Sequence, residues 1–205
     1  MKAKSLELLI ANEARHRGHA EMVQRFQNLR NWDLLPKSRG MHADNLTISQ
    51  IVIGILSIVP MKTGYVNYVH SLLKLKPVGG IQFCQTGTFG KAVEVILEQE
   101  EALKMFREMK VSCSGMDDNA HHSGGTAEII YYNEKKQKEE KIWFVAETAV
   151  SLLQPGAEKD YNSRTGLLQI KDESVFYSSL FKKIVSLLGK EKEYQKAMAI
   201  SYDGN

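Results

Sequence analysis

The sequence has few cysteines and no long apolar run, and both shortages exclude classes of protein. Its two cysteines, Cys84 and Cys113, can by themselves form neither a disulfide framework nor a four-ligand zinc site. The longest apolar candidate, 48–59, is shorter than the ~20 residues that span a bilayer and is interrupted by polar residues and glycine. Two acids, Glu7 and Glu13, flank the first apolar stretch, which argues against a signal peptide. We therefore expect a soluble cytoplasmic protein with no membrane partner.

The charges are unevenly distributed along the chain. Residues 1–76 hold eleven basic and five acidic side chains, a net charge of +6. Residues 77–205 hold sixteen basic and nineteen acidic side chains, a net charge of −3. This contrast indicates that the first part meets a polyanion and that the remainder has another role. Ordinary variation between small domains would give the same contrast, so charge alone does not decide.

Apolar spacing predicts three helices in the N-terminal part. Residues 5–14 and 20–31 each place apolar side chains three or four positions apart, and Gly18 supplies the turn between them. A Thr-x-x-Gln capping box at 47–50 predicts the start of a third helix, which Pro60 ends. Two short helices, a basic loop and a third apolar helix are typical of a winged helix-turn-helix domain.

A longer motif carries a resemblance to a known family. The segment 26–40, with Leu-Leu-Pro at 34–36 and a basic loop after it, is followed by Leu46-Thr47. It resembles the winged helix of MerR-type DNA-binding proteins, in which the recognition helix ends at Gly-Leu-Leu-Pro and a basic wing follows. Asp33 occupies the usual glycine position, and aspartate tolerates the left-handed conformation that this turn requires. The metal-sensing cysteines and the long dimerisation helix of the metal-responsive members are missing, so small regulators of phages or mobile elements are the nearer comparison.

The resemblance, which covers about residues 5–60, implies that the second helix reads double-stranded DNA. Long polar side chains on one helix face suit the major groove, where Arg pairs with guanine and Gln or Asn pairs with adenine. Neighbouring cations would hold phosphates and fix the register. The alternative is a solvated face on an ordinary helical hairpin. The predicted DNA-binding residues are Gln24, Arg25, Gln27 and Asn28 on the helix face, and Arg15, Arg17, His19, Arg30, Lys37 and Arg39 around it.

The rest of the chain predicts a connector with a short helix and a hinge over 61–80, a small α+β domain over 81–190 and a flexible tail over 191–205. The α+β domain contains an acidic helix over 89–109, a final helix over 173–188, and a hairpin loop over the charged run 134–140. Its predicted strands cover 81–84, 111–113, 126–133, 141–146 and 167–170.

One cluster in this domain has the residue types for metal or acid–base chemistry. It contains Asp117, Asp118, His121 and His122 within the segment 117–125. Its spacing matches no common zinc pattern, and we interpret it as a polar surface loop. A metal hydrolase is the third interpretation of the chain, behind two non-enzymatic ones. We expect no catalytic residue, no metal and no cofactor.

The leading hypothesis is a two-domain α+β protein that regulates transcription by sequence-specific DNA binding. The winged helix-turn-helix domain, 1–60, would read DNA as a dimer on two half-sites. The second domain would dimerise or bind a protein partner. The alternative is a phage protein that inhibits a host defence complex or assists DNA packaging. In that case the winged helix would be a docking surface, and the acidic helix near 94–108 would contact the partner.

Overall fold

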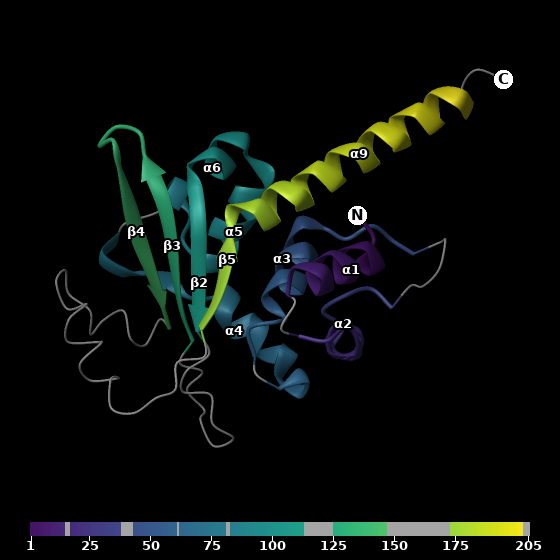
Figure 1. Cartoon of the computed structure of the whole chain (residues 1–205), viewed down its shortest axis with the longest axis horizontal. Helices are drawn as coiled ribbons and strands as arrows, with labels where there is room; N and C mark the ends of the chain where they lie inside the picture. Colours follow the sequence, from purple (N-terminus) through teal and green to yellow (C-terminus); the bar gives the residue numbers. More distant parts are fainter. Residues whose placement is uncertain are drawn as a thin grey trace.

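The computed structural model describes residues 1–14, 17–37, 43–60, 62–80, 83–112, 125–146 and 173–202. It is a mixed α and β fold, in which helices from both halves of the chain cover one face of an antiparallel sheet (Figure 1). In this view, the helix α3, Ile48–Leu56, lies between the sheet and a pair of helices, α1, Ala3–Glu13, and α2, His19–Asn31.

The first two predicted helices are confirmed as α1, Ala3–Glu13, and α2, His19–Asn31. Their apolar faces pack together and on α3, Ile48–Leu56, because side chains three and four positions apart lie on one side of a helix. Gly54 allows the closest approach: a β-carbon there would lie 2.6 Å from Leu6 Cδ2. The capping box of α3 is also confirmed. Thr47 Oγ1 accepts from the Gln50 amide at 3.2 Å, and Gln50 Oε1 accepts from the Thr47 amide at 2.9 Å.

The turn after α2 forms as expected. Asp33 adopts φ 55°, the left-handed conformation, and the next two residues, Leu34 and Leu35, are buried. The chain returns to the start of α1, where Lys2 and Asn45 form an antiparallel bridge and the Leu46 amide donates to the Met1 carbonyl at 2.8 Å. Within the described residues of this loop, the bridge is the only strand-like pairing.

The sheet has the strand order β1-β4-β3-β2-β5, and its neighbouring strands are antiparallel. The predicted hairpin is confirmed as β3 and β4, but its turn covers only 134–137, because the charged residues 138–140 already pair with β3. The strands are β1 Lys76–Pro77, β2 Phe106–Ser112, β3 Thr126–Asn133, β4 Lys138–Val145 and β5 Glu173–Tyr177.

Two long predicted helices are wrong in extent. The helix expected over 89–109 is α5, Phe89–Glu98, then an extended Gln99, then α6, Glu100–Met105; from Phe106 the chain is strand β2. The helix expected from residue 173 starts only at Ser178, as α9, Ser178–Tyr202, after strand β5. In both places pairing within the sheet overrides local helical spacing, because propensity is weaker than tertiary context.

Other predictions of secondary structure have mixed outcomes. The short helix expected in the connector is present as the 3-10 turn η2, Thr63–Tyr68, and α4, Val69–Leu73. Residues 83 and 84, expected as part of a strand over 81–84, lie instead in the 3-10 turn η4, Phe83–Gln85, and η3 covers Val78–Gly80. The tail from residue 191 continues α9 as helix to Tyr202, which projects from the rest of the molecule (Figure 1). The strand expected at 167–170 lies outside the described residues.

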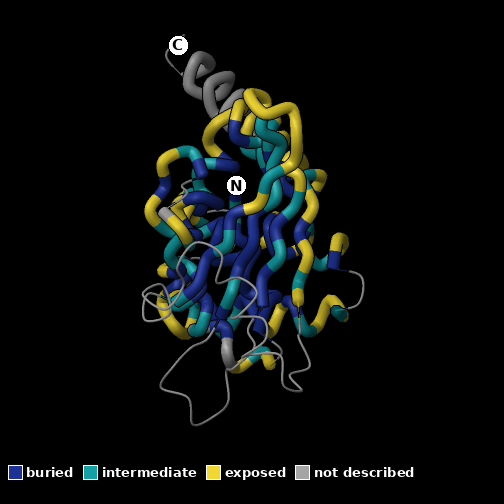
Figure 2. The backbone as a smooth tube through the Cα atoms, turned by 90° about the vertical axis from the view of Figure 1, so that its left-hand side faces the viewer, coloured by how far each residue is buried: buried dark blue, intermediate teal, exposed yellow. Residues whose placement is uncertain are grey.

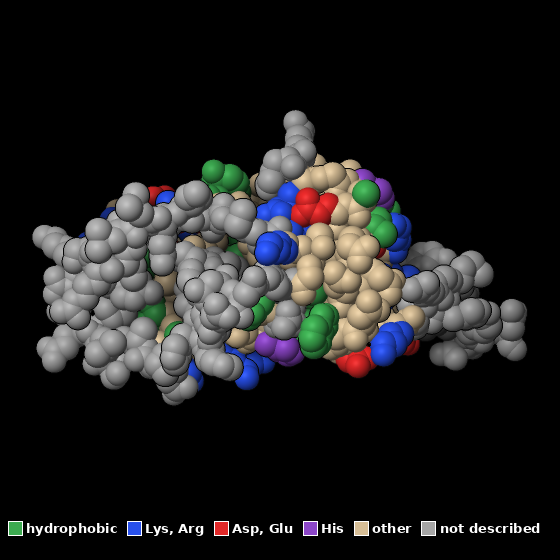
Figure 3. Space-filling view, turned by 90° about the horizontal axis from the view of Figure 1, so that it is seen from below, with side chains coloured by type: hydrophobic (Ala, Val, Ile, Leu, Met, Phe, Trp, Pro, Cys, Tyr) green, Lys and Arg blue, Asp and Glu red, His purple; other side chains and the backbone are tan. Residues whose placement is uncertain are grey.

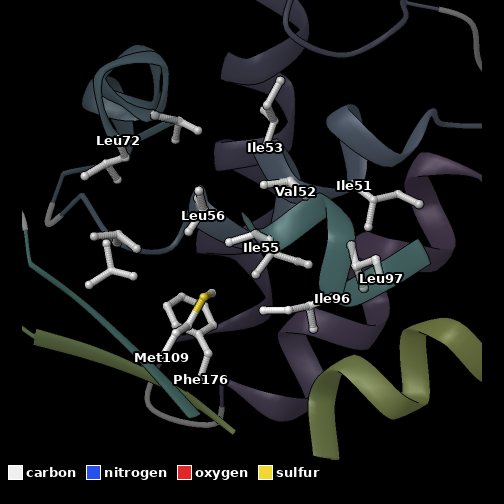
Figure 4. Packing of buried hydrophobic residues seen from close by; sticks show 14 of the residues in the cluster. Ile51, Val52, Ile53, Ile55, Leu56, Leu72, Ile96, Leu97, Met109 and Phe176 are labelled. Atoms are coloured by element: carbon white, nitrogen blue, oxygen red, sulfur yellow. The ribbon is translucent and has the colours of Figure 1, made fainter. Parts of the chain in front are cut away.

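One continuous cluster of buried apolar side chains joins the N-terminal helices to the sheet, and Figure 2 shows the buried chain in the interior. In Figure 4, Met109 and Phe176 lie side by side on the sheet and gather with Ile96 around Ile55 of α3. The expected domains 1–60 and 81–190 therefore share a core in the described residues. Their separation stays a prediction.

Candidate nucleic-acid interface on α2

The exposed side of α2 carries a row of amide side chains. Gln24 Nε2 donates to Asn28 Oδ1 at 3.0 Å, and Gln27 Nε2 donates to Asn31 Oδ1 at 3.0 Å, each across one helical turn. Asn28 Nδ2 in turn donates to the Thr63 carbonyl oxygen of η2 at 2.8 Å. The structure thus brings together three predicted residues and adds Asn31. The sequence signal for Asn31 was present, because it stands four positions after Gln27.

The predicted role of Arg25 is contradicted by its position. Its side chain is fully buried, although we expected it on the outward face with Gln24. The guanidinium donates through Nη1 to the Ser57 carbonyl at 2.6 Å and through Nε to Glu21 Oε1 at 2.9 Å. Arg25 lies with Met22 and Leu29 on the helix face that packs into the core, so it cannot reach a base without unfolding this contact.

The predicted flanking cations are paired with acids. Arg17 Nη1 lies 2.7 Å from Glu21 Oε1, with 18% of the Arg17 side chain exposed. Arg30, 13% exposed, lies 4.0 Å from the buried carboxylate of Glu7. Lys37 lies 2.7 Å from Asp33 in an exposed pair. Arg15 and Arg39 lie outside the described residues.

Charges of both signs are mixed on this part of the molecule. Among the side chains coloured by type on the face seen in Figure 3, Lys and Arg are scattered together with Asp, Glu, His and hydrophobic ones. Glu21 illustrates the local balance: burial works to raise its pKa, but the hydrogen bonds from Arg17 and Arg25 outweigh burial and hold the pKa below its ordinary value. Arg17, Arg30 and Lys37, three of the predicted phosphate contacts, thus each have an acidic neighbour in the structure.

Three further exposed side chains accompany the amides. His19, predicted as a phosphate contact, is exposed at the start of α2. Val23 is exposed on α2, and Trp32, directly after it, is 56% exposed. Sequence reasoning assigned no role to these two apolar residues, although an exposed tryptophan at a helix end is a frequent feature of interaction surfaces.

A second polar cluster lies at the β3–β4 hairpin. Glu140 accepts from Lys136 Nζ at 2.7 Å, from Asn133 Nδ2 at 2.7 Å and from the Tyr131 hydroxyl at 3.2 Å. The hydrogen bonds from Lys136 and Asn133 lower the pKa of Glu140 to about 2. All of these donors to Glu140 belong to the same hairpin. The cluster is therefore a hydrogen-bond network that stabilises the hairpin.

Chemistry elsewhere in the described residues is limited. No group of three or more His, Cys, Asp and Glu side chains there could hold a metal ion. Asp117, Asp118, His121 and His122, the residues of the metal-hydrolase interpretation, lie outside this part of the chain. Burial raises the pKa of the Cys84 thiol. None of the described helices combines the length and apolar character required to cross a membrane.

The chain was also compared with known proteins. It matches none of the protein-family models, curated proteins or solved structures with which it was compared.

Proposed function

We propose that this protein binds double-stranded DNA through the exposed side of α2 and thereby regulates transcription. The observation that carries the proposal is the row Gln24, Gln27, Asn28 and Asn31. Amide side chains are suited to base edges in the major groove, which is wide enough to admit a helix. The segment from α1 to α3 would serve as a winged helix-turn-helix, with the loop after Asp33 as its wing.

The packing of α2 supports this role. Its inner face is held in the core by Phe26 and Leu29, and by the bond from Arg25 to Ser57. In Figure 1, α2 lies on the side of the molecule away from the sheet. A helix held rigidly at the periphery can enter a groove without rearrangement of the fold, which preserves the geometry that base contacts require.

Phosphate contacts would come from cations beside α2. The Lys37–Asp33 pair is exposed on both sides, at 67% and 77% of the two side chains, and such pairs add little stability in water. Exchange of Asp33 for a DNA phosphate therefore costs little. Arg15, Arg39 and His19 complete the proposed phosphate contacts. Arg17 and Arg30 would have to leave Glu21 and Glu7 to join them.

We propose that the protein acts as a homodimer on two half-sites, because a single module has modest affinity. The strand β5 supports a self-contact. It is an edge strand with Val175 and Tyr177 exposed, and beside it lies a cavity of about 120 Å³ lined by residues that include Ile10, Ile58 and Leu180. Sedimentation equilibrium, alone and with duplex DNA, measures the oligomeric state directly.

The decisive experiment for DNA binding is fluorescence anisotropy with labelled duplexes at 50 and 200 mM salt. We expect binding by the wild-type protein that weakens steeply with salt. The double variant Gln24→Ala/Gln27→Ala should lose affinity. Gln99→Ala, which removes an exposed amide between α5 and α6, is the matched control and should not. Equal affinity of both variants would contradict the role of α2.

A second candidate function is favoured by Trp32, which is 56% exposed at the end of α2, because tryptophan is enriched among the residues that dominate protein interfaces. In it, α2 docks on a protein, such as a host defence or DNA-packaging component of a phage system. The acidic contact helix of this alternative would have to be shorter than expected, since α6 ends at Met105. Trp32→Ser should abolish capture of such a partner and leave duplex binding unchanged if the protein contact is separate.

A further inference from the structure

We infer that α2 reads adenine in A·T base pairs, with Gln24 as a specificity-determining residue and Asn28 as the residue that positions it. This inference rests on the proposed DNA-binding function and names the base pairs that function would select. It follows from three observations: which side chains remain on the exposed side of α2, how their amides are oriented, and what hydrogen-bonding groups each base presents.

The exposed side of α2 offers amides and almost no accessible cation. Arg25 is fully buried, and Arg30 is 13% exposed and oriented toward Glu7. Guanine is most often read by Arg or Lys, which donate two hydrogen bonds to its N7 and O6. The helix lacks an exposed Arg or Lys in the middle of this face, so α2 cannot bind guanine through this pair of hydrogen bonds.

A backbone carbonyl fixes the orientation of the amides. The Thr63 oxygen can only accept, so the Asn28 side chain must turn Nδ2 toward it, at 2.8 Å. Asn28 Oδ1 then faces Gln24, which must present Nε2 to it, at 3.0 Å. The Thr63 carbonyl of η2 therefore sets the orientation of the Asn28 amide, and Asn28 sets the orientation of the Gln24 amide.

The orientation of Gln24 selects between purines. Nε2 carries two hydrogens, and the bond to Asn28 uses one of them. One N–H and the carbonyl oxygen Oε1 remain for DNA. Adenine presents one acceptor, N7, and one donor, N6, which match this pair. Guanine presents two acceptors, and its O6 would face Oε1 with no hydrogen between them. Preorganisation by Asn28 thus favours adenine over guanine.

Gln27 and Asn31 form a second amide pair three residues along the helix, in which Gln27 Nε2 donates to Asn31 Oδ1 at 3.0 Å. Gln24 and Gln27 stand three residues apart, so their amides lie on neighbouring parts of the same face. The adenine inference rests on Gln24, whose partner Asn28 is anchored by the Thr63 carbonyl.

The experiment uses the full chain and a pool of duplexes with a randomised central segment, from which bound sequences are recovered and counted. We expect enrichment of adenine at one or more positions for the wild-type protein and for Gln99→Ala. Gln24→Ala should lose the enrichment at one position. Asn28→Ala should discriminate less between adenine and guanine there, because Gln24 Nε2 loses the acceptor that orients it and can then donate to guanine O6.

A modified base in the DNA tests the same contact with the wild-type protein, so the result does not depend on whether a variant folds. In the best recovered duplex, 7-deazaadenine at the enriched position lacks the N7 acceptor but keeps the N6 donor, and the wild-type affinity should fall about 2- to 10-fold, the effect of one lost hydrogen bond. Duplex binding with enrichment of guanine, or with no base preference, would overturn the adenine inference and leave the proposed function standing. Absence of duplex binding at both salt concentrations would overturn the proposed function itself.

Discussion

The guanidinium of Arg25 on α2 donates to the main-chain oxygen of Ser57 at the end of α3, at 2.6 Å and with no exposure to solvent. The two residues are 32 positions apart in the chain, and their bond fixes α2 against α3. The same guanidinium pairs with Glu21, which also binds Arg17. A side chain expected to read DNA is instead part of the internal support of the helix that carries the proposed reading surface.

This position predicts that Arg25→Ala destabilises the fold. Loss of a buried hydrogen-bond donor costs about 1–3 kcal/mol, because the Ser57 oxygen loses the guanidinium, whereas Glu21, 30% exposed, keeps Arg17. Arg25→Met should cost less, since it fills more of the volume. Urea denaturation followed by circular dichroism measures both. If Arg25→Ala unfolded at the same urea concentration as the wild type but bound DNA more weakly, Arg25 would contact DNA and would not support the fold.

The close approach of α5 and α4 at Gly90 predicts a steric effect. A β-carbon at Gly90 would lie 3.0 Å from the Leu73 carbonyl oxygen and 2.9 Å from Leu73 Cδ2. The backbone atom cannot move aside easily, so Gly90→Ala should lower the free energy of unfolding by about 1–3 kcal/mol. Gly87→Ala is the matched control, because nothing lies within 4 Å of its added methyl group. Equal melting temperatures for the two variants would refute the close packing.

The pKa of Glu140 predicts an acid-dependent loss of stability. Hydrogen bonds from Lys136 and Asn133 lower this pKa from 4.5 to about 2, so the unfolded chain takes up the proton first as pH falls. The stabilisation by ionised Glu140 is complete above pH 4.5 and is lost as the pH falls toward 2. Glu140→Gln should therefore be less stable than the wild type at pH 7, and the difference should shrink by pH 3.

Denaturation series at pH 7, 5 and 3 test this dependence. Glu134→Gln, which removes another acid from the same hairpin, serves as the control. Its difference in stability from the wild type should not shrink as the pH falls from 7 to 3. A difference between Glu140→Gln and wild type that stays constant over this range would show that the carboxylate is not held as described.

The exposed pair of Lys37 and Asp33 predicts a salt effect on DNA binding. Lys37→Ala should weaken binding to all duplexes to a similar extent and reduce the slope of log affinity against log salt by about one unit, because one phosphate contact is lost. Lys182→Ala, an exposed lysine on α9, should leave the slope unchanged. An unchanged slope for Lys37→Ala would count against the loop after α2 as a wing.

Local signals in the sequence were reliable where a single turn or cap decides the structure. The Thr47–Gln50 capping box forms because its two partners are three residues apart and meet in any helix start. Asp33 enters the left-handed region as expected, and α1 and α2 follow their apolar spacing. These features require only neighbours in the chain, so the sequence contains the information for them.

In the second half of the chain, the sequence predicted the ends of helices and strands less well. Residues 106–109 continue the helical spacing of α5, but Phe106 pairs with Tyr131 and Met109 pairs with both Ile129 and Phe176. Such pairings join segments tens of residues apart, and their hydrogen bonds and burial outweigh local propensity. The same reason explains why residues 173–177 are strand while the helix begins only afterwards.

The sequence by itself determined the mixed α and β character, the three N-terminal helices, the left-handed turn at Asp33 and the β3–β4 hairpin, because each depends on short-range spacing. Only the tertiary structure decided which polar residues of α2 face solvent. Helical periodicity places Arg25 beside both Gln24 and Met22, and a long cation is expected outside unless a partner exists within the core. The Ser57 carbonyl and Glu21 are those partners. Ser57 is 32 residues from Arg25 in the chain, so this contact exists only once α2 and α3 have packed together.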